Sequence, residues 1–205
     1  QDVVLQLHML PTGKPEVLHA EIGLYTTTEP PERTPLMLRL GDLRIDIPAN
    51  ESTYRIRDEF QLPVDVNVIG VYTHAHYLGQ QMTATAALPN GTEITLIHIP
   101  RWNFNWQDAY RYPKPIELPA KTTIQMEFLY DNSKGNPLNP NDPPRRVVWG
   151  PSSYDEMGDL WLQVLPLDPR DLQTLKKTYL KREFYARLAG YEHTVRIDPN
   201  NLEAQ

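Results

Sequence analysis

Two short segments far apart in the sequence carry side chains that could bind a metal ion. The first contains His74 and His76, and the second, about eighty residues later, contains Met157. Histidines at positions i and i+2 of an extended strand project from the same face of a sheet, so both imidazoles can reach one ion. A thioether is a soft donor that suits Cu(I) better than Zn²⁺, Mg²⁺ or Ca²⁺. Together the three side chains point to copper, with a coordination position left open for oxygen or substrate.

Each half of this pattern also has a simpler interpretation. A His-x-His pair in a strand is more often two hydrogen-bonded or exposed histidines than a metal site. A methionine just before a strand usually fills the core. The spacing alone therefore leaves both a copper site and ordinary structural roles open.

The sequence around these residues resembles a known family. Residues 73–79 and 152–157 are similar to the C-terminal catalytic domain of the copper type II, ascorbate-dependent monooxygenases. That family includes peptidylglycine α-hydroxylating monooxygenase and dopamine β-monooxygenase. Residues 100–107 and 130–133 extend the similarity, which covers roughly residues 1–166 and points to the bacterial branch. The resemblance implies that His74, His76 and Met157 hold the copper at which oxygen is activated.

The resemblance also implies partners that complete the chemistry. In the family, ascorbate or another reductant supplies electrons through a second copper, which a preceding domain of the same precursor holds. His8 matches a last histidine of that second site, so this chain alone is expected to be inactive. O₂ and a small-molecule substrate would be the reactants. Glu156 and Asp159 are the candidates for proton transfer, and Glu156 is equally plausible as a hydrogen-bond acceptor beside the ligands.

Three positions depart from the peptide-amidating members of the family. Those members have an arginine, tied to carboxylate recognition, where this chain has Tyr72. They have asparagine and tyrosine where this chain has Asp159 and Trp161. A negative charge at Asp159 would repel a substrate carboxylate. Glycine-extended peptides are therefore not expected as substrates.

Composition narrows the class of protein further. The net charge of −6 gives no electrostatic reason to expect nucleic acid or an anionic membrane as partner. The absence of cysteine excludes disulfides and thiol catalysis. No signal peptide and no apolar run long enough to cross a bilayer is present, and the first residue is Gln1. We interpret the chain as part of a longer precursor, which the resemblance places in the periplasm or outside the cell.

Residues 1–166 are predicted to form an all-β domain. Apolar or alternating runs rich in β-branched and aromatic residues cover residues 3–7, 36–47, 53–60, 64–72, 82–88, 94–99, 123–130 and 160–165. Pro89-Asn90-Gly91 predicts a hairpin with a type I′ turn. Many short strands with such turns favour two packed antiparallel sheets. The resemblance implies the same fold, a jelly-roll-like antiparallel β-sandwich.

Residues 167–205 are predicted to be helical. Asp168 can cap the helix and Pro169 suits its first position. Apolar residues then recur at helical spacing, namely Leu172, Leu175, Tyr179, Leu180, Phe184, Leu188 and Val195, and Gly190 marks a weak point or a break. Residues 191–204 resemble the junction between tetratricopeptide repeats, which would offer a surface to a protein partner. An ordinary C-terminal helix is the alternative.

Two other functions compete with oxygenase activity. The chain could be a copper-binding or interaction module that has lost the oxygenase chemistry. It could also be a jelly-roll carbohydrate-binding module, in which Trp102, Trp106 and Tyr110 form an exposed stacking platform. Exposure of all three aromatic side chains would favour the carbohydrate-binding module.

Overall fold

The computed structural model describes residues 4–5 and 12–200 of the chain. Contacts divide the chain into two units, Gln1–Glu32 and Arg33–Gln205. In the first unit the described residues form no helix or strand, and their large apolar side chains are exposed. The strand predicted over residues 3–7 lies largely outside the described residues, and His8 lies wholly outside them.

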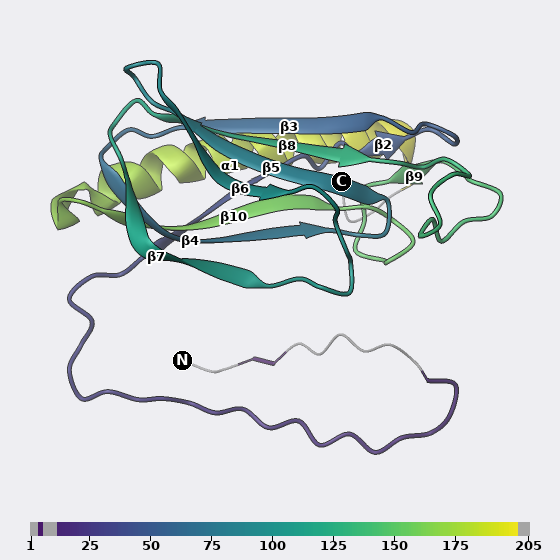
Figure 1. Cartoon of the computed structure of the whole chain (residues 1–205), viewed down its shortest axis with the longest axis horizontal. Helices are drawn as coiled ribbons and strands as arrows, with labels where there is room; N and C mark the ends of the chain where they lie inside the picture. Colours follow the sequence, from purple (N-terminus) through teal and green to yellow (C-terminus); the bar gives the residue numbers. More distant parts are fainter. Residues whose placement is uncertain (1–3, 6–11, 201–205) are drawn as a thin grey trace. The chain divides into compact units, whose positions relative to one another are not determined.

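The second unit is an antiparallel β-sandwich with one long helix (Figure 1). One sheet has the order β1 (Leu36–Gly41), β10 (Gly158–Pro166), β4 (Val66–Ala75), β7 (Ala109–Leu118). The other has the order β3 (Tyr54–Gln61), β8 (Thr123–Tyr130), β5 (Gly79–Ala87), β6 (Glu93–Ile99). A short third sheet pairs β2 (Asp46–Ile47) with β9 (Val147–Val148). The predicted jelly-roll-like sandwich with a helical extension is confirmed.

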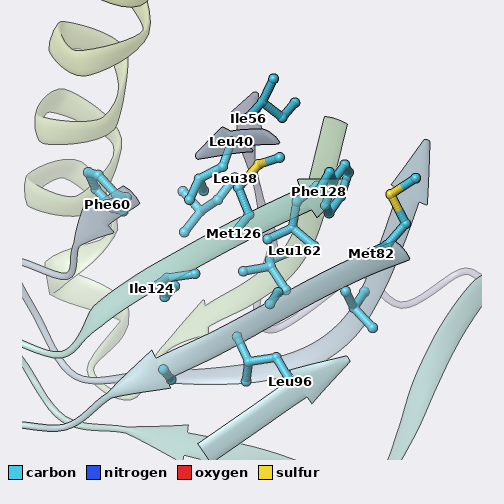
Figure 2. Close-up of a cluster of buried hydrophobic side chains, with 14 of the residues drawn as sticks. Leu38, Leu40, Ile56, Phe60, Met82, Leu96, Ile124, Met126, Phe128 and Leu162 are labelled. Carbon is cyan, nitrogen blue, oxygen red and sulfur yellow. The ribbon is translucent and has the colours of Figure 1, made fainter. Parts of the chain in front are cut away.

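The core lies between the two large sheets. Ile124, Met126 and Phe128 of β8 meet Leu38 of β1 and Leu162 of β10 there (Figure 2). Because successive side chains of a strand point to opposite faces, the intervening residues lie on the outer surfaces of the sandwich. Burial alternates along β4 except at Gly70 and Val71, and Tyr72 and His74 are among its side chains on the outer face of the sheet.

Strand β7 is the one long strand that the sequence pattern does not predict. Pro113 and Pro115 interrupt its alternation, and proline cannot donate a hydrogen bond within a sheet. The strand nevertheless forms, because it lies at the sheet edge and pairs only with β4. Its register on β4 shifts between Val68 and Gly70, and both prolines lie in this interruption. β7 and the loop before it bring Gln107 beside the end of β4.

The hairpin between β5 and β6 forms as predicted, but its turn differs in type. Gly91 has a φ of +85°, whereas Asn90 is not among the residues with positive φ. The Gly91 N–H donates to the carbonyl of Leu88 at 3.0 Å. A type I′ turn requires positive φ at both central residues, so the type I′ prediction is wrong. Pro89 favours the observed turn, because its ring fixes φ at a negative value.

Helix α1 (Leu172–Ile197) follows a short 3₁₀ turn, η1 (Pro169–Asp171). Asp168 caps this turn by accepting from the Arg170 N–H, as predicted. The helix runs unbroken through Gly190, where an added Cβ would lie 2.5 Å from the Cβ of Leu43. Glycine at this position therefore permits close packing. Within the described residues, no helix is both long and apolar enough to cross a membrane.

Helix α1 covers the side of the sandwich where β1 and β3 approach each other. The Tyr179 hydroxyl accepts from the backbone N–H of Arg39 at 2.8 Å, and Arg182 donates to the Arg39 carbonyl at 3.2 Å. Arg182 also pairs with Asp58 of β3. Leu175 is fully buried beside Tyr179. The helix thus satisfies the backbone N–H and carbonyl of Arg39 on the free edge of β1, and an open strand edge can pair with another chain.

Candidate copper site

His76 follows the last residue of β4 and is anchored through its Nδ1 atom. Nδ1 lies 3.0 Å from the backbone carbonyl oxygen of Asp155. Because a carbonyl only accepts hydrogen bonds, Nδ1 carries the proton and Nε2 keeps a free lone pair. Burial lowers the pKa of His76, although the bond to Asp155 opposes this shift. The ring is therefore held in the neutral form that metals bind.

His74, on the outer face of β4, is held in the same way by a side chain. Its Nδ1 lies 2.6 Å from Oε1 of Gln107. The Gln107 amide is itself oriented, because its Nε2 donates to the carbonyl of Phe104 at 2.8 Å. The Tyr72 hydroxyl reaches the same Oε1 at 3.3 Å. With Nδ1 donating to Gln107, the Nε2 of His74 also keeps a free lone pair.

The two imidazoles lie close together. Their ring centroids are 5.1 Å apart and the rings are nearly perpendicular, at 81°. This proximity is what the i, i+2 spacing of His74 and His76 predicts. The two groups that orient the rings, Gln107 and the Asp155 carbonyl, are not predicted from the sequence, because each is distant along the chain from the histidine that it orients.

Met157 lies directly before β10, the strand that neighbours β4. Gly158 pairs with Ala75 in the ladder between β10 and β4, so the next step of the register places Met157 across from His76. The Met157 carbonyl accepts from the Tyr130 hydroxyl at 2.9 Å, which holds this residue at the start of β10. An added Cβ at Gly158 would overlap Ile56 and the Tyr130 hydroxyl, so this contact requires glycine. The register thus brings the backbones of all three predicted ligand residues to the same end of the two central strands, β4 and β10.

Glu156 binds the backbone of both segments that carry the predicted ligands. Its side chain is fully buried and accepts from three backbone N–H groups, those of His76, Met157 and Leu78. Burial raises the pKa of Glu156 to about 8, although the same three N–H donors oppose this rise. Of the two roles predicted for Glu156, this arrangement favours a hydrogen-bond acceptor that fixes the ligand backbone.

Asp159 lies directly across from His74 in the ladder and is buried. Its Oδ1 lies 2.6 Å from the guanidinium of Arg39 on β1. The positive charge of Arg39 therefore balances the carboxylate. The sequence alone suggests that Asp159 repels a substrate carboxylate, and this ion pair weakens that repulsion. The replacement of arginine by Tyr72 is therefore the stronger departure from the peptide-amidating enzymes.

A small hollow of about 110 Å³ lies on the outer face of the same sheet. Tyr72, Tyr110 and Trp161 contribute aromatic walls, and Gln163 and Arg111 are polar groups in its lining. The Tyr72 ring stacks at 11° on the ring of His74, with centroids 6.5 Å apart. The hollow is thus separated from the histidine pair by a single aromatic ring.

The aromatic residues proposed as a carbohydrate platform do not share one surface environment. Trp102 is buried, and its Nε1 donates to the His76 carbonyl at 3.1 Å. Trp106 is 70% exposed and Tyr110 is 39% exposed. The condition that would favour a carbohydrate-binding module, exposure of all three rings, is therefore not met. Trp102 instead supports the backbone of the histidine segment.

Among the described residues, no group of three or more His, Cys, Asp and Glu side chains is arranged to hold a metal. The proposed ligand set contains only two side chains of these types, the two histidines, because its third member is a methionine. The donor set nevertheless fits copper, because both free imidazole nitrogens are oriented and the third position is a soft sulfur. His8, the proposed ligand of a second copper, lies outside the described residues.

We expect replacement of Gln107 by leucine to weaken Cu(I) binding about 10- to 100-fold, as is typical when a group that orients a ligand is lost. The reason is that His74 Nδ1–H would lose its acceptor and the ring would lose its orientation. Gln107→Glu keeps an acceptor and should restore most of the affinity. Titration against a chromophoric Cu(I) chelator measures the effect. Gln125→Leu, on the other sheet, is the control, and an equal loss there would contradict the assignment.

Comparisons with known proteins do not define a family. No family model matches the chain. No curated protein matches it either. Among solved structures, one of the infectious bursal disease virus Gt strain is 13% identical and covers 81% of this chain and 50% of that chain, with a TM-score of 0.29. A mutant VP2 protein of the same virus, in derived T=1 particles, is 13% identical and covers 90% and 58%, also with a TM-score of 0.29.

The chain therefore spans about half the length of the solved structures that it matches. TM-scores this low carry no argument about fold or function.

Proposed function

We propose that this chain is the catalytic-half domain of a copper-dependent monooxygenase, with His74, His76 and Met157 as the copper ligands. One observation carries the proposal: both histidines are fixed through Nδ1, which leaves both Nε2 atoms free on rings 5.1 Å apart. Histidines that serve only the packing of a sandwich do not need this shared orientation. The sequence resemblance supports the same three residues.

When bound, copper would supply the redox chemistry that activates O₂ and hydroxylates a C–H bond of a small molecule. The residues of this chain have supporting roles. Gln107 and the Asp155 carbonyl orient the two imidazoles with Nε2 free. Glu156 joins the backbone of His76 to that of Met157 and acts as a positioning residue.

The wider reaction requires partners outside this chain. Electrons would come from ascorbate or another reductant, through a second copper held by an N-terminal domain of the same precursor, to which His8 would contribute. The protein is proposed to be bacterial and to act in the periplasm or outside the cell. The substrate would be a small molecule that places an apolar or aromatic group in the hollow beside Tyr72, because three of its walls are aromatic.

The ligand set predicts how single substitutions change copper affinity. His74→Ala and His76→Ala should each weaken Cu(I) binding by about 100-fold or more, because each removes one of three donors, a loss of about 3 kcal/mol. Met157→Leu should weaken Cu(I) more than Cu(II), because a thioether chiefly serves the softer ion. Chelator competition in both oxidation states measures the affinities. Met82→Leu, in the core, is the control, and an equal loss of both ions in Met157→Leu would argue against a sulfur ligand.

A further inference from the structure

The outward face of α1 carries a row of exposed apolar side chains. Leu180, Phe184, Leu188 and Tyr191 are 42% to 64% exposed. They follow one another at intervals of four, four and three residues, so they form one continuous line along the helix, here called the apolar stripe. The opposite face of α1 packs on the sandwich through Leu175 and Tyr179. The helix is thus apolar on both faces, and the described part of the chain covers only one of them.

Basic residues border the apolar stripe on both sides. At 100° per residue, Lys176 and Arg187 lie along one side and Lys177 and Lys181 along the other. Among the described residues, none of these three lysines takes part in an ion pair. Helix α1 contains six Lys and Arg against two Glu, whereas the chain has a net charge of −6. The apolar stripe is therefore flanked by positive charge, although the protein as a whole is acidic.

From this arrangement we infer that the apolar stripe of α1 is a docking surface for an amphipathic helix whose apolar face is bordered by carboxylates. Apolar residues at these intervals are suited to pack against the ridge of a second helix. Arg187 already pairs with Glu183. The three flanking lysines therefore select the charge of the docking helix, since each would lie opposite a carboxylate at the rim of the interface.

Charge argues against two other occupants. A second copy of the chain would bring two basic stripes together, and like charges at an interface are unfavourable. The net charge of −6 divides into +4 on α1 and −10 on the remainder of the chain. An anionic membrane would attract α1 but repel that remainder. An acidic helix meets the basic borders without approaching the acidic remainder.

Designed helical peptides of three heptads test this inference directly. One peptide has leucine along its apolar face and glutamate at the flanking positions, and its partner has lysine at those positions. Fluorescence anisotropy should show that the glutamate peptide binds about 10-fold more tightly, as expected for three exposed charge pairs. Lys177→Glu combined with Lys181→Glu should reduce or reverse this preference.

The apolar contribution is tested by Phe184→Ser combined with Leu188→Ser, which should reduce binding of the glutamate peptide at least about 10-fold. The matched control is Leu138→Ser combined with Tyr154→Ser, two exposed apolar residues outside α1. Circular dichroism establishes that all variants remain folded. Equal affinity for the two peptides, binding of neither, tighter binding to phosphatidylserine vesicles, or dimerisation through the stripe would each overturn the inference.

Discussion

Removal of residues 168–205 is expected to leave a chain that no longer folds stably as a monomer. Burial of Leu175 and Tyr179 contributes about 2 kcal/mol each. The two hydrogen bonds from α1 to the backbone of Arg39 contribute about 1 kcal/mol each. The total of about 6 kcal/mol is comparable to the whole stability of a typical domain, which is about 5–15 kcal/mol.

The shortened chain would also expose the free edge of β1. We therefore expect it to aggregate or to pair through that edge, which size-exclusion chromatography and thermal unfolding would detect. Removal of residues 198–205 alone is the control, because it leaves α1 complete and should change little. A shortened chain that stays monomeric with an unchanged melting temperature would mean that the helix is dispensable for the sandwich.

Replacement of Glu156 by alanine is expected to lower the free energy of unfolding by about 3–6 kcal/mol. The substitution leaves the buried N–H groups of His76 and Leu78 without their acceptor, at a cost of about 1–3 kcal/mol each. The N–H of Met157 is only part-buried and adds less. Chemical denaturation measures the loss. Copper affinity should fall as well, because the same bonds join the two ligand segments.

Two further variants separate this role from a general loss of charge. Glu156→Gln keeps one oxygen but turns an amide N–H₂ toward a backbone donor, so its cost should be intermediate, about 1–3 kcal/mol. Glu93→Ala removes an exposed carboxylate and should cost less than about 0.5 kcal/mol. If Glu156→Ala were as stable as Glu93→Ala, Glu156 would not be holding the ligand segments together.

The sequence predicts most of the sandwich because alternation is a local signal. Strands β3, β6 and β8 lie within one residue of their predicted limits. Strand β7 is not predicted because it contains two prolines, which a sheet tolerates only at an edge or a bulge. Which strand lies at an edge depends on the order of the whole sheet, and the local sequence does not reveal that order.

The apolar pattern of α1 is misleading for a different reason. Phe184 and Leu188 recur at helical spacing but are exposed, whereas the docked face contains Glu183 and Gly190. Arg182 and Arg187 pair with Glu183, which allows its carboxylate to lie in that face. The helix therefore docks partly through ion pairs and close packing, which hydrophobic periodicity does not detect.

The candidate site divides in the same way between local and distant signals. The spacing of His74 and His76 is local, and it correctly predicts that the rings are close. The partners that orient these rings come from the loop before β7 and the segment before β10, so only the assembled sheet reveals them. A glutamine followed by an edge strand gives no recognisable signal in a single sequence. Gln107 could therefore not have been identified beforehand.

X-ray absorption spectroscopy of the Cu(I)-loaded protein tests the central claim most directly, because it reports the atoms bound to copper without requiring a substrate. Two imidazole nitrogens and one sulfur are expected, with the sulfur signal lost in Met157→Leu and retained in Met82→Leu. A spectrum with no sulfur in the wild-type protein, or a sulfur signal that persists in Met157→Leu, would contradict it.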